Sequence, residues 1–242
     1  MIQTPLYPVL IHKNVDCETP VSIYQKIRQP GLPSFLLESV EGQEKWARYS
    51  FIGFQPLATF QSRGTQTILT LAGRQKKKKV TDPFLEWEQF FRSFKIVSSS
   101  QKDEQRSRFF GGAVGYLSYE MIRHFEKIGG RKVKDDLAAP DCFFMIPEIL
   151  LVFDNIRHRL DLIGFATKDR LKEVERRLKE ISLRIDSGVG APLGAPKKEG
   201  TASSAPTKLN WSPAAFKKAV SRVKNYIVAG DVTQTVLSLR QS

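Results

Sequence analysis

One short segment carries side chains that could bind a small charged molecule. The run Phe35-Leu36-Leu37-Glu38-Ser39 begins as an apolar strand and ends in a carboxylate and a hydroxyl. At the edge of a dry pocket, the carboxylate could bind an ammonium group, and the hydroxyl could bind an amino group or a carboxylate. Many buried strands also end in polar residues, so the plain end of a core strand is the alternative interpretation.

The other patterns that usually indicate catalysis are missing. His12, His124 and His158 are isolated, without a second metal ligand at helical spacing, and we interpret them as surface or capping residues. The run Gly111–Gly115 has neither GxGxxG nor GK[ST] spacing, so close approach of a neighbouring backbone explains its glycines better than phosphate binding. Ser118 lacks the context of a nucleophile elbow. The sequence therefore predicts no catalytic residue and no metal site.

The chain has a large surplus of basic residues. It contains 38 Lys and Arg against 25 Asp and Glu in 242 residues, a net charge of +13. Such a surplus is typical of proteins that bind nucleic acid or a membrane surface, or of enzymes with anionic ligands. The densest run, Lys76–Lys79, closely follows a turn at Ala72-Gly73, and no zinc-finger, basic-zipper or RNP-like spacing is present. We interpret the run as a solvated hairpin tip and expect no nucleic-acid partner.

Cysteine usage and hydropathy indicate a cytoplasmic protein. Cys17 and Cys142 are far apart and form no CxxC motif, which fits a reducing compartment. The beginning of the chain lacks the basic and apolar regions of a signal peptide. No apolar run approaches the roughly 20 residues that span a bilayer. We expect a soluble cytoplasmic protein without a membrane partner.

Local patterns predict a mixed fold. Thr19-Pro20 and Asp82-Pro83 are typical helix starts, and an apolar stripe from Leu171 to Ile185 predicts a long charged helix. A short helix is expected through His124. Strands are expected over 34–40, 49–54, 57–61, 65–71, 75–80, 109–119, 142–146, 148–153 and 159–165. Because strands and helices do not alternate strictly, the predicted class is α+β, with a mixed, largely antiparallel sheet packed with helices.

The composition changes near residue 187. Residues 187–207 are almost entirely Gly, Ala, Pro, Ser and Lys, so we predict a flexible linker over 187–210, after a first domain at 1–186. Ser212-Pro213 then opens an amphipathic helix that ends at Gly230, and a strand is expected over 232–239. One helix and one strand cannot form a core. We therefore expect 211–242 to be the start of a truncated second domain, or to dock on the first.

Several segments together resemble one enzyme family. Pro33–Gly42 and the following Glu44–Gly53 look very like the amino-terminal region of anthranilate synthase component I. Three further segments agree in order and spacing: Thr19–Ser22, Gly111–Glu120 and the strand pair around Val152–Asp154. The tail, Phe216–Arg240, resembles the first helix and strand of the chorismate-binding domain in the same family. Thr233 and Leu239 depart from the family pattern, in which an aromatic or aliphatic residue and a Gln are usual.

The resemblance implies a lyase of tryptophan biosynthesis. The family makes anthranilate and pyruvate from chorismate and ammonia, which a glutamine amidotransferase subunit supplies, and Mg²⁺ helps to hold chorismate. Tryptophan inhibits by feedback at a Leu-Glu-Ser motif, which corresponds here to Leu37, Glu38 and Ser39. The Mg²⁺ carboxylates and the catalytic histidine belong to the family's later domain and have no counterpart here. The resemblance therefore implies that this chain alone is inactive.

Three alternatives stay open. The first is a fragment of aminodeoxychorismate synthase component I, although the Leu-Leu-Glu-Ser motif followed by Trp46–Gly53 favours anthranilate synthase. The second is a non-enzymatic module that senses an amino acid or binds a subunit. Such a chain would bind tryptophan by itself, without a further domain. A basic nucleic-acid binder is the most distant and predicts strongly salt-dependent binding.

Overall fold

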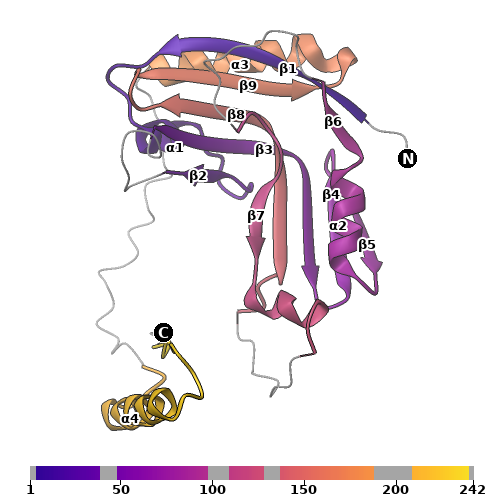
Figure 1. Ribbon diagram of the computed structural model, residues 1–242. Helices are drawn as coiled ribbons and strands as arrows, with labels where there is room; N and C mark the ends of the chain where they lie inside the picture. Colours follow the sequence, from indigo (N-terminus) through magenta and orange to yellow (C-terminus); the bar gives the residue numbers. More distant parts are fainter. Residues whose placement is uncertain (1–3, 39–47, 98–108, 128–136, 188–208, 240–242) are drawn as a thin grey trace, which may run out of the picture. The chain divides into compact units, whose positions relative to one another are not determined.

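The computed structural model describes residues 4–38, 48–97, 109–127, 137–187 and 209–239 (Figure 1). The chain divides into two compact units, Met1–Leu193 and Gly194–Ser242. The described part of the first unit contains a nine-stranded, largely antiparallel sheet with helices packed against it. This architecture confirms the predicted fold class.

Two long antiparallel strands, β3 (Tyr49–Arg63) and β8 (Cys142–Asp154), organise the sheet. The two strands pair with each other, and on its other side each strand has one neighbour along its first half and a different one along its second half. The first half of β3 pairs with β2 (Phe35–Leu37) and the second half with β4 (Gln66–Leu71), whereas β8 pairs with β7 (Val114–Leu117) first and β9 (Arg159–Ala166) later. The sheet therefore has two arms, which meet at a bend in β3 and β8 (Figure 1).

The first arm contains β2, the first half of β3, the second half of β8, β9 and β1 (Thr4–Asn14). β1 also pairs in parallel with β6 (Phe94–Ile96). The second arm contains β7, the first half of β8, the second half of β3, β4 and β5 (Arg74–Lys79), which is the edge strand. The predicted hairpin of β4 and β5 is confirmed, with its turn at Ala72-Gly73.

The prediction of separate strands on either side of Pro56 and Pro147 is wrong. The two prolines lie opposite each other in the register of β3 and β8, and the pairing shifts by one residue between Pro56 and Ala58. Proline has no N–H to donate, so a break was the local expectation. On each side of the prolines, apolar residues keep β3 and β8 paired. The two strands bend where the prolines meet.

Other strand predictions differ in length. The strand expected over 34–40 is observed over Phe35–Leu37, and the one over 109–119 is confined to Val114–Leu117. The sequence analysis missed β1 and β6 entirely. Pro5 and Pro8 concealed β1, because prolines argue against a strand unless their missing N–H groups face an edge.

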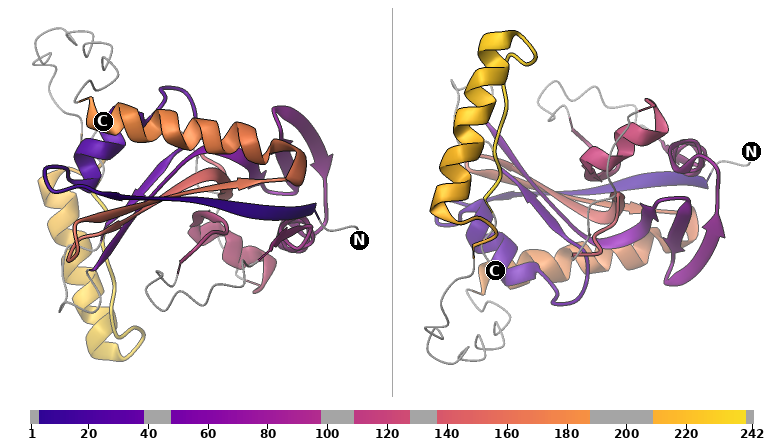
Figure 2. Two further views of the ribbon diagram at one scale, coloured as in Figure 1. Left: turned by 90° about the horizontal axis from the view of Figure 1, so that it is seen from above. Right: turned by 90° about the horizontal axis from the view of Figure 1, so that it is seen from below.

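The helices on the first arm pack on one face of the sheet. α1 (Pro20–Ile27) begins at the predicted cap, where the Thr19 side chain accepts a hydrogen bond from the Ser22 amide, and α3 (Leu171–Asp186) follows β9. Figure 2 shows α3 running along the sheet. The two helices cover a core of fully buried side chains that includes Ile23, Ile52, Leu151, Leu162 and Leu178. A Cβ on Gly164 would lie 2.3 Å from Val174, so glycine allows α3 to approach β9.

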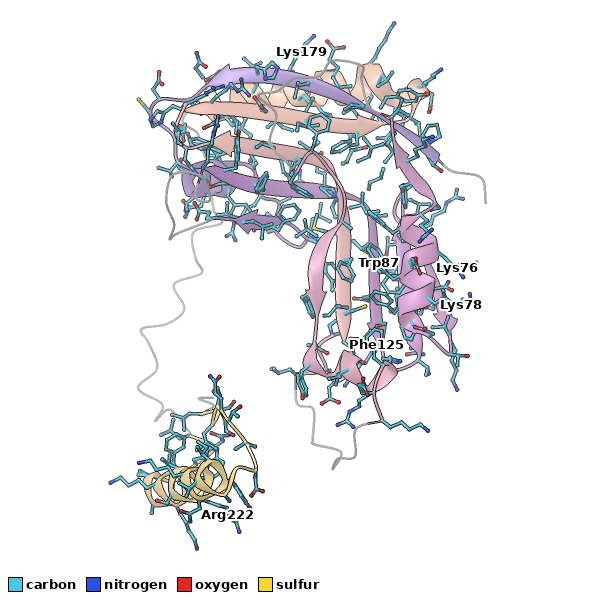
Figure 3. All side chains as sticks on the ribbon, viewed as in Figure 1. Lys76, Lys78, Trp87, Phe125, Lys179 and Arg222 are labelled. Carbon is cyan, nitrogen blue, oxygen red and sulfur yellow. The ribbon has the colours of Figure 1, made fainter. Side chains whose placement is uncertain are left out.

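α2 (Pro83–Phe91) packs against the second arm and begins at the predicted Asp82 cap. The Trp87 ring stacks on Phe144 with 4.5 Å between centroids, and it points toward the sheet in Figure 3. A Cβ on Gly115 would lie 1.9 Å from the carbonyl oxygen of Phe143. This confirms that close backbone approach explains that glycine. The predicted short helix is a 3-10 helix, η1 (Tyr119–His124).

The lysine run is exposed, and it lies in the strand that was expected over 75–80 rather than at the hairpin tip. Lys76–Lys79 do not form the hairpin tip, but lie along β5 itself, where every side chain is exposed. The tip is at Ala72-Gly73, whose φ angles are +47° and +77°. Lys78 lies 2.8 Å from Glu86 of α2, and Figure 3 shows Lys76 and Lys78 beside that helix. Exposed lysines on an edge strand discourage pairing with other chains.

The second unit contains α4 (Pro213–Ala229). Its cap at Ser212 and its left-handed Gly230, with φ +79°, confirm the predicted helix bounds. The strand predicted over 232–239 is wrong, because these residues adopt no regular structure. A strand needs a neighbour for its backbone hydrogen bonds, and the described residues of this unit supply none. The linker predicted over 187–210 lies mostly outside the described residues, so that boundary stays a prediction.

Candidate functional site

The first two residues of the Leu-Glu-Ser segment, Leu37 and Glu38, lie at an edge of the first arm. β2 pairs with β3 so that Leu37 is opposite Phe51. Leu37 is 44% exposed and Glu38 is also exposed, whereas Ser39 lies outside the described residues. The ring of Phe35 covers Gly53, where a Cβ would lie 2.1 Å from the ring, so β2 lies close against β3. The structure therefore brings Leu37 and Glu38 to the end of a short edge strand.

Around Leu37, the sheet face opposite α1 and α3 is rich in aromatic rings. The rings of Phe51 and Phe109 meet edge to face, with 5.3 Å between centroids. We call this surface the aromatic face, and define it by the partly buried Phe35, Tyr49, Phe51, Phe109 and Phe110 around the buried Leu150, Val152, Ile163 and Phe165. Partly exposed rings offer an apolar surface on which an aromatic ligand or another protein surface can pack.

An ion pair borders the aromatic face. The Arg48 guanidinium binds the Asp154 carboxylate through Nη2 at 2.6 Å and Nε at 3.0 Å. Asp154 is 2% exposed and also accepts hydrogen bonds from the amides of Ile156 and Arg157. The Arg48 guanidinium lies 4.9 Å from the centroid of the Tyr49 ring, in a cation–π contact. The pair therefore fixes the start of β3, the end of β8 and one ring of the aromatic face together.

The pKa of Asp154 is lowered by this arrangement. Burial would raise the pKa of the carboxyl, but the hydrogen bonds from Arg48 and from two backbone amides outweigh burial. The carboxylate is therefore ionised at neutral pH, and its partner Arg48 stays charged. The sequence analysis did not single out this pair, because 106 residues separate its members along the chain.

The other candidates from the sequence stay apart from one another. His12 bonds Asp161 at 2.8 Å and its side chain is 47% exposed, which fits a surface residue. His124 ends η1, and His158 lies in the turn between β8 and β9. The buried Ser118 hydroxyl lies at the start of η1. Among the described residues, no base lies within hydrogen-bond distance of it.

The described residues do not fit a magnesium site. Within the ranges that the structure describes, no three His, Cys, Asp or Glu side chains are grouped closely enough to hold a metal ion. Mg²⁺ requires oxygen ligands, commonly one or two carboxylates with water or substrate. In the same part of the chain, no helix is both long and apolar enough to cross a membrane.

Comparison with known proteins relates the chain to one family. The family model for chorismate binding enzymes matches residues 33–242. Anthranilate synthase component 1 of Acetivibrio thermocellus is 31% identical over 247 residues, which cover 97% of this chain and 48% of that protein. The Thermus thermophilus protein of the same name is 33% identical over 232 residues, 94% of this chain and 46% of that one.

A solved structure confirms the fold. The crystal structure of anthranilate synthase component I from Streptococcus pneumoniae superposes with a TM-score of 0.52 at 21% identity. The match covers 89% of this chain and 45% of that one. The chain thus spans about half the length of the curated relatives it matches. Because the family match extends over most of its length, the chain belongs to the chorismate binding enzyme family.

Proposed function

We propose that the chain is part of an anthranilate synthase component I, the lyase that forms anthranilate and pyruvate from chorismate and ammonia. The observation that carries this proposal is the family match over residues 33–242, combined with relatives of that name at 31% and 33% identity across nearly the whole chain. In this proposal the protein is cytoplasmic, and a glutamine amidotransferase subunit supplies the ammonia. Chorismate and Mg²⁺ bind to residues beyond those described here.

The role proposed for the first unit is feedback inhibition by tryptophan at Leu37, Glu38 and Ser39. A bound amino acid must have its ammonium and carboxylate paired when its side chain is buried. Glu38 and Ser39 offer groups for that pairing, and Leu37 lines the apolar part of the site. The position of Leu37 opposite Phe51, at the border of the aromatic face, supports this role, because an indole can pack on aromatic rings.

The experiment that tests the proposed reaction measures anthranilate by its fluorescence. We expect no product from the isolated chain with chorismate, Mg²⁺ and either ammonia or glutamine. The same chain extended to the full length of its relatives should make anthranilate with ammonia alone, and with glutamine once the amidotransferase subunit is added. Formation of aminodeoxychorismate instead of anthranilate would assign the chain to the alternative enzyme, and turnover by the isolated chain would contradict the expected inactivity.

A further inference from the structure

α4 has the largest net charge of the described helices. It contains four basic residues and no acidic one, and among the described residues after it only Asp231 is acidic. The basic residues are Lys217, Lys218, Arg222 and Lys224. Within the part of the chain that the structure describes, none of the four forms an ion pair with a carboxylate. Their charge is therefore not compensated by the described residues of this unit.

The long helix α3 shows that basic residues elsewhere in this chain are compensated. The ion pairs of α3 include Arg176 with Glu180, Lys179 with Glu175, and Arg177 with Glu148. In α4, by contrast, Lys218 and Arg222 lie one turn apart, where like charges repel and weaken a helix. The last turn of α4, where cations would favour the helix dipole, has no basic residue. The charges of α4 thus do not stabilise their own helix.

The four basic residues share the solvent-exposed side of α4. At about 100° per residue they lie around Ser221 and Asn225, and all of these side chains are exposed. The partly buried positions of the helix are on the opposite side: Phe216, Ala219, Val220 and Val223. The segment after Gly230 runs back beside α4 (Figure 2), and Trp211 meets the Phe216 ring edge to face. We call the exposed side, defined by the four basic residues with Ser221 and Asn225, the basic face.

The spacing along the basic face matches a second helix. The basic side chains form two rows, Lys217 with Lys224 and Lys218 with Arg222. The first row spans two turns, about 10 Å at roughly 1.5 Å per residue. Between the rows the polar side chains are shorter, so a ridge of side chains from another helix can pack there. Carboxylates on that helix would then lie beside both rows.

The position of the aromatic rings favours a protein over nucleic acid or lipid. Single-stranded nucleic acid stacks its bases on aromatic rings beside basic residues, but Phe216, which Trp211 contacts, lies on the side away from the basic face. A lipid surface takes up the apolar side of a basic helix, and that side is the partly buried one in this unit. An acidic protein surface requires only the exposed charges.

We propose that the basic face of α4 binds an acidic helix of a partner protein, whose Asp and Glu side chains pair with the two rows of basic residues. Opposite charges on the two surfaces speed the encounter and fix the orientation of the partner. Because the pairs are exposed, salt screens them, and binding weakens as the salt concentration rises. This inference depends neither on the reaction nor on the tryptophan site proposed above.

The test uses the full chain and a capped, alanine-based peptide of about 20 residues, which is long enough to be helical by itself. Its Glu side chains recur at every third or fourth position and share one side of the peptide helix. Fluorescence anisotropy measures Kd at about 0.1 M salt, where charges more than roughly 10 Å apart are largely screened. The same peptide with Gln in place of Glu is the control probe and should not bind.

Two variants that lose the same charge separate a defined site from net charge. Replacing all four basic residues of the basic face with Gln should weaken binding of the acidic peptide about tenfold or more, because the charges that attract it are gone. Replacing Lys76–Lys79 of β5 with Gln also removes four exposed charges and should leave Kd within about twofold. An equal loss in both variants would mean that only net charge matters, and would overturn the proposal.

A further variant separates the role of charge from helix stability. Lys217→Arg, Lys218→Arg and Lys224→Arg combined keep the charge and should leave Kd within about twofold, since Arg, Lys and Gln have similar helix propensities. Loss of binding in the Gln variant and retention in the Arg variant, with equal circular dichroism spectra, supports the proposal. Wild type that does not bind the acidic peptide would overturn it. Tighter binding of single-stranded DNA or of phosphatidylserine vesicles, lost in the same Gln variant, would likewise overturn it.

Discussion

The two faces of the first arm differ in how completely this chain covers them. Side chains alternate along β8, so Ile149, Leu151 and Phe153 face α1 and α3, whereas Leu150 and Val152 belong to the aromatic face. On the helix-covered face, the side chains of β8 are at most 3% exposed. On the aromatic face, a buried centre is surrounded by rings that are only partly buried. One strand thus supports a closed core on one side and an accessible apolar surface on the other.

This difference separates what stabilises the fold from what the fold presents to other molecules. The helix-covered face is closed by α1 and α3 of the same chain. Its packing therefore stabilises the fold without a contribution from another molecule. The aromatic face borders both the Arg48–Asp154 pair and the Leu37-Glu38 strand end. We therefore expect substitutions on the first face to act on stability, and those on the second to act more on binding.

The largest expected effect compares two phenylalanines on opposite faces. Phe153→Ala should lower the free energy of unfolding by about 3–5 kcal/mol, because the ring is 3% exposed and its loss leaves a cavity under α1 and α3. Phe51→Ala should cost about half as much, because the ring remains partly in contact with solvent. Urea unfolding of both variants measures the difference. Equal losses would show that the aromatic face is as fully packed as the other.

The Arg48–Asp154 pair should give the next largest effect. Arg48→Ala leaves a buried carboxylate without its cation and should cost about 3 kcal/mol at pH 7. Because the pKa of Asp154 is lowered in the folded state, the stabilisation is present above the ordinary carboxyl pKa near 4 and is lost as the pH falls through the folded value. The difference between wild type and variant should therefore shrink on acidification below about pH 4. A difference that is constant from pH 7 to pH 3 would contradict the role of this pair.

Ser39 tests whether the Leu-Glu-Ser segment is regulatory. In the full-length protein, Ser39→Ala should weaken tryptophan inhibition by about 10- to 150-fold, the equivalent of about 1.5–3 kcal/mol for a hydrogen bond to a charged group. The catalytic rate without tryptophan should change little. If the inhibition constants of wild type and variant agree within about twofold, the regulatory assignment is wrong and the Leu-Glu-Ser segment is only the end of a core strand.

The smallest effect is expected at the edge of the second arm. Replacing Lys76–Lys79 with Gln should change the free energy of unfolding by under about 0.5 kcal/mol, because every side chain of β5 is exposed. Binding of single-stranded DNA should stay equally weak in both proteins. A fall of several degrees in Tm would show that the contacts of these lysines, such as Lys78 with Glu86, stabilise the hairpin.

The sequence by itself determined the features that depend on neighbouring residues. Thr19, Asp82 and Ser212 each cap a helix at the predicted position, because a capping bond joins groups two or three residues apart. The hairpin at Ala72-Gly73 was predicted for the same reason. Residue order and spacing across the Leu-Glu-Ser region also identified the family, which the match over residues 33–242 confirms.

Tertiary structure decided the features that join distant residues. Whether a strand continues through Pro56 depends on its partner at Pro147, and the sequence alone showed only two prolines that argue for a break. Residues 232–239 have a strand-like composition but adopt no regular structure, since strand hydrogen bonds come from a neighbour. Likewise, the Arg48–Asp154 pair exists only because β3 and β8 run side by side. Local hydrogen bonds can be inferred from sequence patterns, whereas pairings across a hundred residues depend on the closure of the whole sheet.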